Sequence, residues 1–160
     1  MIVRNKPVLN EPAATGNGEL ALIIIRWCFA VSYIVLIFLF AKCPQSSAYN
    51  MAEQLFSWFP FLAETDIPVF VFYMRKSLHV LGYLIGTCII FYAVKVTPVL
   101  KKSVHISTLG LALLLAVLDE WYQTTLPHRS GRIEDVFIDL IGIIIGLLLL
   151  RDNRKASGLN

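Results

Sequence analysis

The sequence predicts an all-α fold, a polytopic membrane four-helix bundle. Of the 160 residues, 57% are hydrophobic and only 16% are charged, which is too few to coat a soluble domain of this length. The apolar residues gather into four segments, each long enough to cross a bilayer. Most charged residues lie between or beside these segments, as expected for loops at the membrane surface.

The first span is expected at residues 20–41, with one charge, Arg26, near its start. A cleaved signal peptide usually has a shorter apolar core followed by a small-x-small site, so we expect an uncleaved helix. The preceding residues 1–19 are polar and contain Pro, Gly and Asn. We expect them to form a flexible cytoplasmic tail.

Residues 42–66 are mixed in character. Met51, Leu55, Trp58 and Leu62 recur at helical spacing in an aromatic-rich stretch, which favours a short interfacial helix between the first and second spans. A packed loop is the alternative for this segment.

The other three spans are expected at residues 70–94, 103–122 and 133–150. Pro68 suits the first turn of the second span. A basic turn separates the second and third spans, and a polar turn with Pro127 and Gly131 separates the third and fourth. The membrane domain would therefore cover residues 20–150, followed by a basic cytoplasmic tail at residues 151–160.

Basic residues predict the orientation of these spans. Four spans place both termini on one side of the membrane, and that side would hold nine basic residues against five on the other. Because basic residues concentrate on the cytoplasmic side, we expect cytoplasmic termini. The nine are Arg4, Lys6, Arg26, Lys95, Lys101, Lys102, Arg151, Arg154 and Lys155, and the five are Lys42, Arg75, Lys76, Arg129 and Arg132.

Several function classes lack support. The net charge is only +3, and the basic residues are scattered singly or in pairs, which does not indicate nucleic-acid binding. No Gly-rich phosphate loop or zinc-ligand spacing occurs, and we expect no cofactor. Cys28, Cys43 and Cys88 are too few and too widely spaced to predict a disulfide framework.

Polar residues from three spans are expected at similar depth. The second span would start outside, the third would end outside, and the fourth would start there again. This topology brings together His79, Asp119, Glu120, Gln123, Asp135 and Asp139. We expect them to surround a hydrated cavity that opens outward.

The helical faces sharpen this expectation. Asp135, Asp139, Gly142 and Gly146 are spaced by four, three and four residues, so they share one face of the fourth span. Gly142-x-x-x-Gly146 permits close helix packing. Asp139 should not face lipid, because a charge at the bilayer centre costs roughly 3 kcal/mol on insertion scales. Its partner would be water, His79 or one of the cations Arg75, Lys76, Arg129 and Arg132. Ion pairs that only fix the packing of the bundle are the alternative explanation for these acids.

Two motifs resemble the VanZ-like family. "DEWYQTTLPHRSGRIEDVFIDLIGIIIG" has its Asp-Glu pair, a Gln three residues after the Glu, a Pro-x-Arg turn, an Asp opening the last helix and a Gly-x-x-x-Gly below it. "RKSLHVLGYLIG" is similar to its second motif, with Lys76, His79 and Tyr83 in the expected places, although Gly82 stands where the family often has Glu. The resemblance covers about residues 75–150. It implies a small bacterial cytoplasmic-membrane protein, and the family's named member confers low-level resistance to the glycopeptide teicoplanin.

The sequence is compatible with three functions. The first is a cell-envelope protein whose outward-facing polar site binds or modifies an anionic lipid-linked or wall-derived molecule. The second is a metal-assisted membrane hydrolase or transferase, and the third is a non-catalytic packing or partner protein. For the first, the expected partners are the bilayer and a lipid-linked cell-wall intermediate, not nucleic acid. The acid–base groups would be His79, Asp119, Glu120 and Asp139, and the ligand-binding residues Arg75, Lys76, Tyr83, Gln123, Arg129, Arg132 and Asp135.

Overall fold

The computed structural model describes residues 16–61, 66–127, 129 and 131–151, and the predicted all-helical fold is confirmed for them, with no strand among these residues. Most of both predicted tails, residues 1–15 and 152–160, lies outside the described residues. The α-helices are α1 Gly16–Lys42, α2 Ala48–Trp58, α3 Asp66–Val96, α4 Val104–Thr124 and α5 Ile133–Arg151. Short 3-10 turns at Pro44–Ser46 and Lys101–Ser103 precede α2 and α4.

Three helical segments of the described chain are long and apolar enough to cross a membrane: Gly16–Lys42, Asp66–Val96 and Lys101–Thr124. Helix α5 is apolar along most of its 19 residues but carries Glu134, Asp135 and Asp139 near its start. The predicted fourth crossing therefore stays a prediction. A short helix, α2, is present where the sequence favoured one, and its position relative to a bilayer is likewise a prediction.

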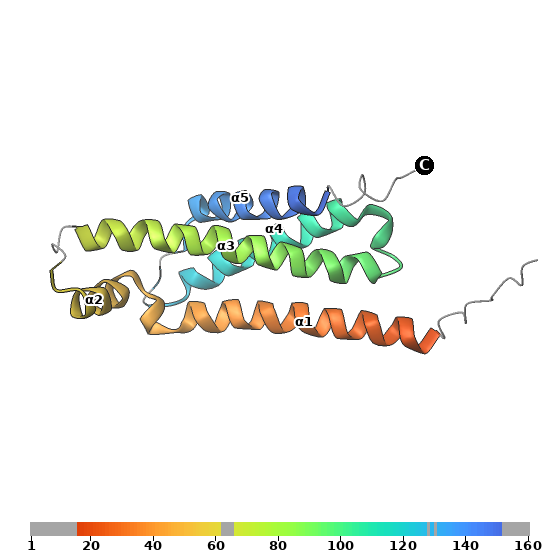
Figure 1. Cartoon of the computed structure of the whole chain (residues 1–160), viewed down its shortest axis with the longest axis horizontal. Helices are drawn as coiled ribbons and strands as arrows, with labels where there is room; N and C mark the ends of the chain where they lie inside the picture. Colours follow the sequence, from red (N-terminus) through yellow and green to blue (C-terminus); the bar gives the residue numbers. More distant parts are fainter. Residues whose placement is uncertain (1–15, 62–65, 128, 130, 152–160) are drawn as a thin grey trace, which may run out of the picture.

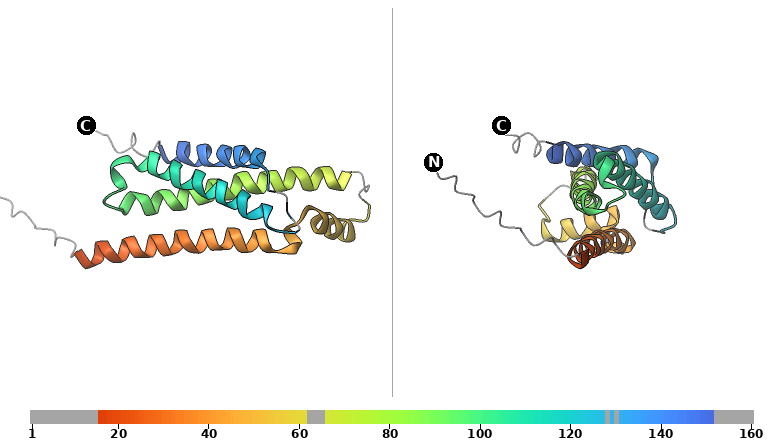
Figure 2. Two further views of the ribbon diagram at one scale, coloured as in Figure 1. Left: turned by 180° about the vertical axis from the view of Figure 1, so that it is seen from behind. Right: turned by 90° about the vertical axis from the view of Figure 1, so that its right-hand side faces the viewer.

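Helix α3 is the centre of the structure and contacts all four other α-helices (Figure 1). Helices α4 and α5 pack on one side of α3, whereas α1 lies along another, as the end-on view in Figure 2 makes clear. Helices α3 and α5 run in the same direction, so residues near the start of one meet residues near the start of the other. Helix α1 begins and α5 ends at the same end of the bundle.

The core is formed where α3, α4 and α5 meet. Tyr83, Val94, Ala112, Ala116 and Ile143 are all buried there. The outward surfaces are apolar as well, with exposed side chains such as Phe29 on α1 and Phe70 on α3. Apolar surfaces of this kind on every long helix suit a lipid environment.

Glycines of α5 set its distance from α3. A Cβ atom at Gly142 would lie 2.2 Å from the backbone oxygen of Val80, and one at Gly146 would lie 3.1 Å from that of Leu84. At Gly142, only a residue without a side chain lets the two backbones approach so closely. The Gly-x-x-x-Gly motif predicted from the sequence therefore packs directly on α3.

Three polar side chains of α1 donate hydrogen bonds to α3 or to Thr97 directly after it. The Tyr33 hydroxyl donates to the backbone oxygen of Gly82 at 2.8 Å, and Trp27 Nε1 donates to Thr97 Oγ1 at 2.8 Å. Arg26 donates to the backbone oxygen of Tyr92, also at 2.8 Å. These bonds lie toward the middle and the N-terminal half of α1, and the C-terminal half of α1 forms one wall of a cavity.

Candidate functional site

Two polar contacts join the first turns of α5 to α3. Lys76 Nζ forms an ion pair with Asp135, and one helical turn further on His79 Nδ1 lies 2.9 Å from Asp139 Oδ1. Because α3 and α5 are parallel, the sequence offset within each pair is nearly the same, 59 and 60 residues. Asp139 is fully buried and takes His79 as its partner, one of the groups that the sequence offered.

Helix α4 contributes three buried polar side chains on one face: Asp119, Glu120 and Gln123. Gln123 Nε2 donates to Asp119 Oδ2 at 3.0 Å and to Glu120 Oε1 at 3.3 Å. The Tyr83 hydroxyl of α3 donates to the same Asp119 oxygen at 3.3 Å. Gln123 and Tyr83 thus hold the two carboxylates in position.

Gly131 and Arg132, directly before α5, lie against α4. The backbone N–H of Arg132 donates to Glu120 Oε2 at 2.8 Å, while the Arg132 residue itself is exposed. A Cβ atom at Gly131 would lie 2.1 Å from the backbone oxygen of Glu120, so the close approach requires glycine at this position. The turn therefore fixes Glu120 through backbone groups and does not use the arginine charge.

Two arginines lie near the same acids without pairing with them. Arg129 donates to Ser46 Oγ at 2.6 Å and to the backbone oxygen of Ala41 at 3.4 Å. Within the described part of the chain, no carboxylate oxygen lies within 4.0 Å of Arg75 or Arg129. Burial lowers the pKa of Arg129, and the nearby Arg75 charge lowers it further. Both guanidinium groups stay charged, because arginine is not deprotonated in proteins.

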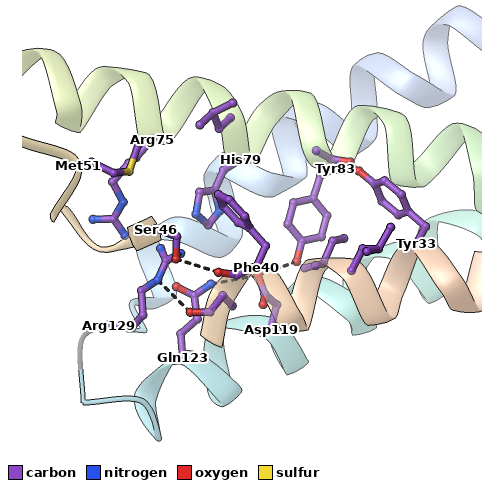
Figure 3. Close-up of a pocket in the computed structure, with 15 residues that line it drawn as sticks. Tyr33, Phe40, Ser46, Met51, Arg75, His79, Tyr83, Asp119, Gln123 and Arg129 are labelled. Carbon is purple, nitrogen blue, oxygen red and sulfur yellow. Dashed lines mark hydrogen bonds between the residues drawn. The ribbon is translucent and has the colours of Figure 1, made fainter. Parts of the chain in front are cut away.

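These groups border a cavity of about 290 Å³ between α1, α3 and α4, which we call the arginine pocket. Figure 3 shows Arg75 and Arg129 extending toward one end of it, near Ser46, with Tyr33 and Tyr83 at the other. The pocket is lined by Tyr33, Leu36, Ile37, Phe40, Ala41, Ser46, Met51, Arg75, Leu78, His79, Gly82, Tyr83, Asp119, Gln123 and Arg129. It therefore combines a cationic end with a largely apolar wall.

Three polar atoms in and beside this pocket are buried and have no hydrogen-bond partner within the described residues. They are Arg75 Nε, Asp119 Oδ1 and Asp139 Oδ2. Buried polar atoms are nearly always paired in native proteins, so unpaired ones indicate a group that the protein itself does not supply. One unpaired atom belongs to a cation and two belong to acids.

The family model described as VanZ/LLP1 matches residues 25–153 of the chain. The chain belongs to the VanZ/LLP1 family. No curated protein and no solved structure matches it. The match includes the C-terminal half of α1, which forms the apolar wall of the arginine pocket, as well as the two motifs that resembled this family in the sequence.

The structure brings together the four predicted acid–base groups. His79 and Asp119 line the arginine pocket, whereas Glu120 and Asp139 lie behind them. Of the predicted ligand-binding residues, four line the pocket: Arg75, Tyr83, Gln123 and Arg129. Lys76 and Asp135 pair with each other away from the lining, and Arg132 is exposed. The roles of all these residues stay predictions.

Sequence reasoning missed the contribution of α1 and of the turn that follows it. Leu36, Ile37 and Phe40 resemble ordinary lipid-facing residues, and nothing in their spacing marks them as a pocket wall. Tyr33 and Ser46 were the available signals, since each is a polar residue within or next to an apolar span. Ser46 is buried, and its hydroxyl donates to the backbone oxygen of Phe40 at 2.8 Å and accepts from Arg129.

Proposed function

We propose that this VanZ-type membrane protein belongs to the bacterial cell envelope and that its arginine pocket binds an anionic, lipid-linked or cell-wall-related molecule. One observation carries the proposal: the same pocket contains two arginines and an apolar wall. Neither arginine has a carboxylate partner among the described residues. An anionic headgroup would accept hydrogen bonds from Arg75 and Arg129, as phosphate and carboxylate groups commonly do. The attached apolar chain would lie along Leu36, Ile37 and Phe40.

The size of the pocket favours a headgroup with the first part of a chain. About 290 Å³ is at the lower limit of ligand pockets in proteins. A whole lipid would extend beyond it over the exposed apolar surface of α1, where Leu36 and Phe40 are 61% and 58% exposed. This geometry supports a substrate drawn from the bilayer.

A binding experiment tests this proposal. Arg75→Ala and Arg129→Ala should each weaken binding of an anionic phospholipid, phosphatidylglycerol, to the detergent-purified protein about tenfold or more, as measured by native mass spectrometry. The lost contacts are charge-assisted hydrogen bonds, which contribute about 1.5–3 kcal/mol each. Lys101→Ala is the control, because Lys101 is exposed and lies outside the pocket. Arg132→Ala tests whether loss of an arginine in the neighbouring turn, outside the pocket lining, also weakens binding.

Equal binding of phosphatidylglycerol and neutral phosphatidylcholine by wild type and variants would contradict the proposal. Loss of assembly without a specific loss of binding would instead favour a packing or partner role. In cells, we expect production of the wild-type protein to lower teicoplanin susceptibility and the two pocket variants to lose that effect. An unchanged glycopeptide response would remove the resistance part of the proposal.

We further propose that the pocket faces outward and that both termini are cytoplasmic. Lys95, Lys101, Lys102 and Arg151 all belong to the bundle end at which α1 begins and α5 finishes, opposite the arginine pocket, in agreement with the usual distribution of basic residues. In a chain whose own cysteines are replaced, an impermeant thiol reagent applied to intact cells should modify Thr125→Cys and not Lys101→Cys. The reverse labelling pattern would overturn the orientation.

A metal-assisted hydrolase or transferase is the second candidate function. One observation favours it: a ligand atom from each of His79, Glu120 and Asp139 lies within 4.8 Å of the others. Loss of every measurable activity on addition of a chelator would support this function, and activity that is indifferent to the chelator would exclude it.

A further inference from the structure

We propose that His79, Glu120 and Asp139 bind one divalent first-row transition-metal ion, such as Zn²⁺ or Mn²⁺, behind the wall of the arginine pocket. The three side chains come from α3, α4 and α5, and one nitrogen and two carboxylate oxygens lie within 4.8 Å of one another. Ligand atoms around a single ion are separated by roughly 3–4 Å when the bonds are about 2.1 Å long. Small side-chain movements would close the remaining gap.

The unpaired oxygens point to the same ligand independently. Asp139 is fully buried, and its Oδ2 has no partner among the described residues; the same holds for Oδ1 of Asp119, which is 3% exposed. Three carboxyl groups, those of Asp119, Glu120 and Asp139, therefore share a buried region in which His79 contacts Asp139 directly. A divalent cation bound by His79, Glu120 and Asp139 would satisfy Oδ2 of Asp139 and offset the buried negative charge.

Two of the cations that could compete for these acids are otherwise occupied, and a third, Arg75, has no carboxylate oxygen within 4.0 Å among the described residues. Lys76 pairs with Asp135, and Arg129 donates to Ser46 and Ala41. Among the described residues, Glu120 accepts only a backbone N–H and an amide N–H, so lone pairs remain on its oxygens. The competition by arginines that would weaken a metal site is not observed in the described residues.

The surrounding groups resemble the outer shell of a metal site. Gln123 donates to both Asp119 and Glu120, and the backbone N–H of Arg132 donates to the other oxygen of Glu120. Such hydrogen bonds orient metal ligands. An imidazole with two carboxylates favours a transition-metal ion over Mg²⁺ or Ca²⁺, which prefer oxygen ligands alone.

The ion would add a charge next to the proposed ligand. Of the three ligands, His79 lines the arginine pocket, so an open coordination position on its side could accept an oxygen of an anionic headgroup. This role rests on the proposed function, whereas metal binding itself does not. The two can therefore fail separately.

Metal binding is tested on the full-length protein in detergent, stripped with chelator and free of added lipid. Titration calorimetry with ZnCl₂ and MnCl₂ should show one site per chain in the wild type. His79→Ala, Asp139→Asn and Glu120→Gln should weaken binding at least tenfold, with retained helicity and monodispersity confirming the fold. Glu134→Gln is the matched control, because Glu134 is an exposed acid on the same helix as Asp139.

A second readout covers the case in which a variant does not fold. Co²⁺ added to the wild-type protein should give visible absorption bands of low-symmetry nitrogen and oxygen coordination, and one equivalent of Zn²⁺ should abolish them. Absence of a stoichiometric site for all three ions would overturn the proposal, as would Asp139→Asn protein that binds metal as tightly as wild type. Phosphatidylglycerol binding measured with and without chelator then shows whether the metal contributes to the pocket.

Discussion

Helix α3 has two unlike interfaces, one with α5 and one with α1. The interface with α5 is close: Gly142 lies against the backbone of Val80, and the polar pairs above it are buried or half-buried. The interface with α1 is more open, and the arginine pocket occupies part of it. The comparison indicates a compact unit of α3, α4 and α5 that holds the acids, with α1 added as an apolar wall.

Among substitutions that test this difference between the two interfaces, the one at Gly142 is expected to change stability most. Gly142→Ala should lower the free energy of unfolding by about 1–3 kcal/mol, because the new methyl group would clash with backbone and not with a movable side chain. Thermal unfolding of the detergent-purified protein measures the change.

Gly110 provides the matched control for that substitution. A Cβ atom at Gly110 of α4 would meet nothing within 4 Å, so Gly110→Ala should leave stability unchanged or raise it by up to about 1 kcal/mol through helix propensity. Equal effects at the two glycines would show that the close interface between α3 and α5 is not stabilising.

A smaller effect is expected on the open side of α3. Tyr33→Phe removes one hydrogen bond to the Gly82 backbone oxygen and should cost about 0.5–1.5 kcal/mol. The aromatic ring at position 33 would still lie beside Gly86, so the packing of α1 on α3 should not change. Thermal unfolding again provides the measurement, with the exposed Tyr73→Phe as control. A loss larger than that of Gly142→Ala would reverse the ranking of the two interfaces.

Much of the candidate site could be predicted from the sequence, because helical periodicity and depth are both encoded locally. The spacing of Asp135, Asp139 and Gly142 places all three on one face of α5. Topology then places that face at the depth of His79 and Asp119. These two arguments anticipated which polar residues meet, although not their pairing.

The pairing was not predictable, since it depends on the rotation and offset of one helix relative to another. Lys76, Arg75, Arg129 and Arg132 were equivalent candidates in the sequence. In the structure Lys76 takes Asp135, and the close contact at Gly142 sets the offset that brings His79 opposite Asp139. Arg75 and Arg129 have no carboxylate partner among the described residues, and their charges give the pocket its cationic end.

By itself, the sequence determined an all-helical chain with long apolar helices, polar residues at one end, and the face on which each acid lies. It did so because hydrophobic length and helical period are properties of each segment alone. The tertiary structure alone decided that α1 forms the apolar wall. It also decided that, among the described residues, two arginines have no carboxylate partner and two buried carboxylate oxygens have no hydrogen-bond partner. These features arise from packing between segments, which no single segment encodes.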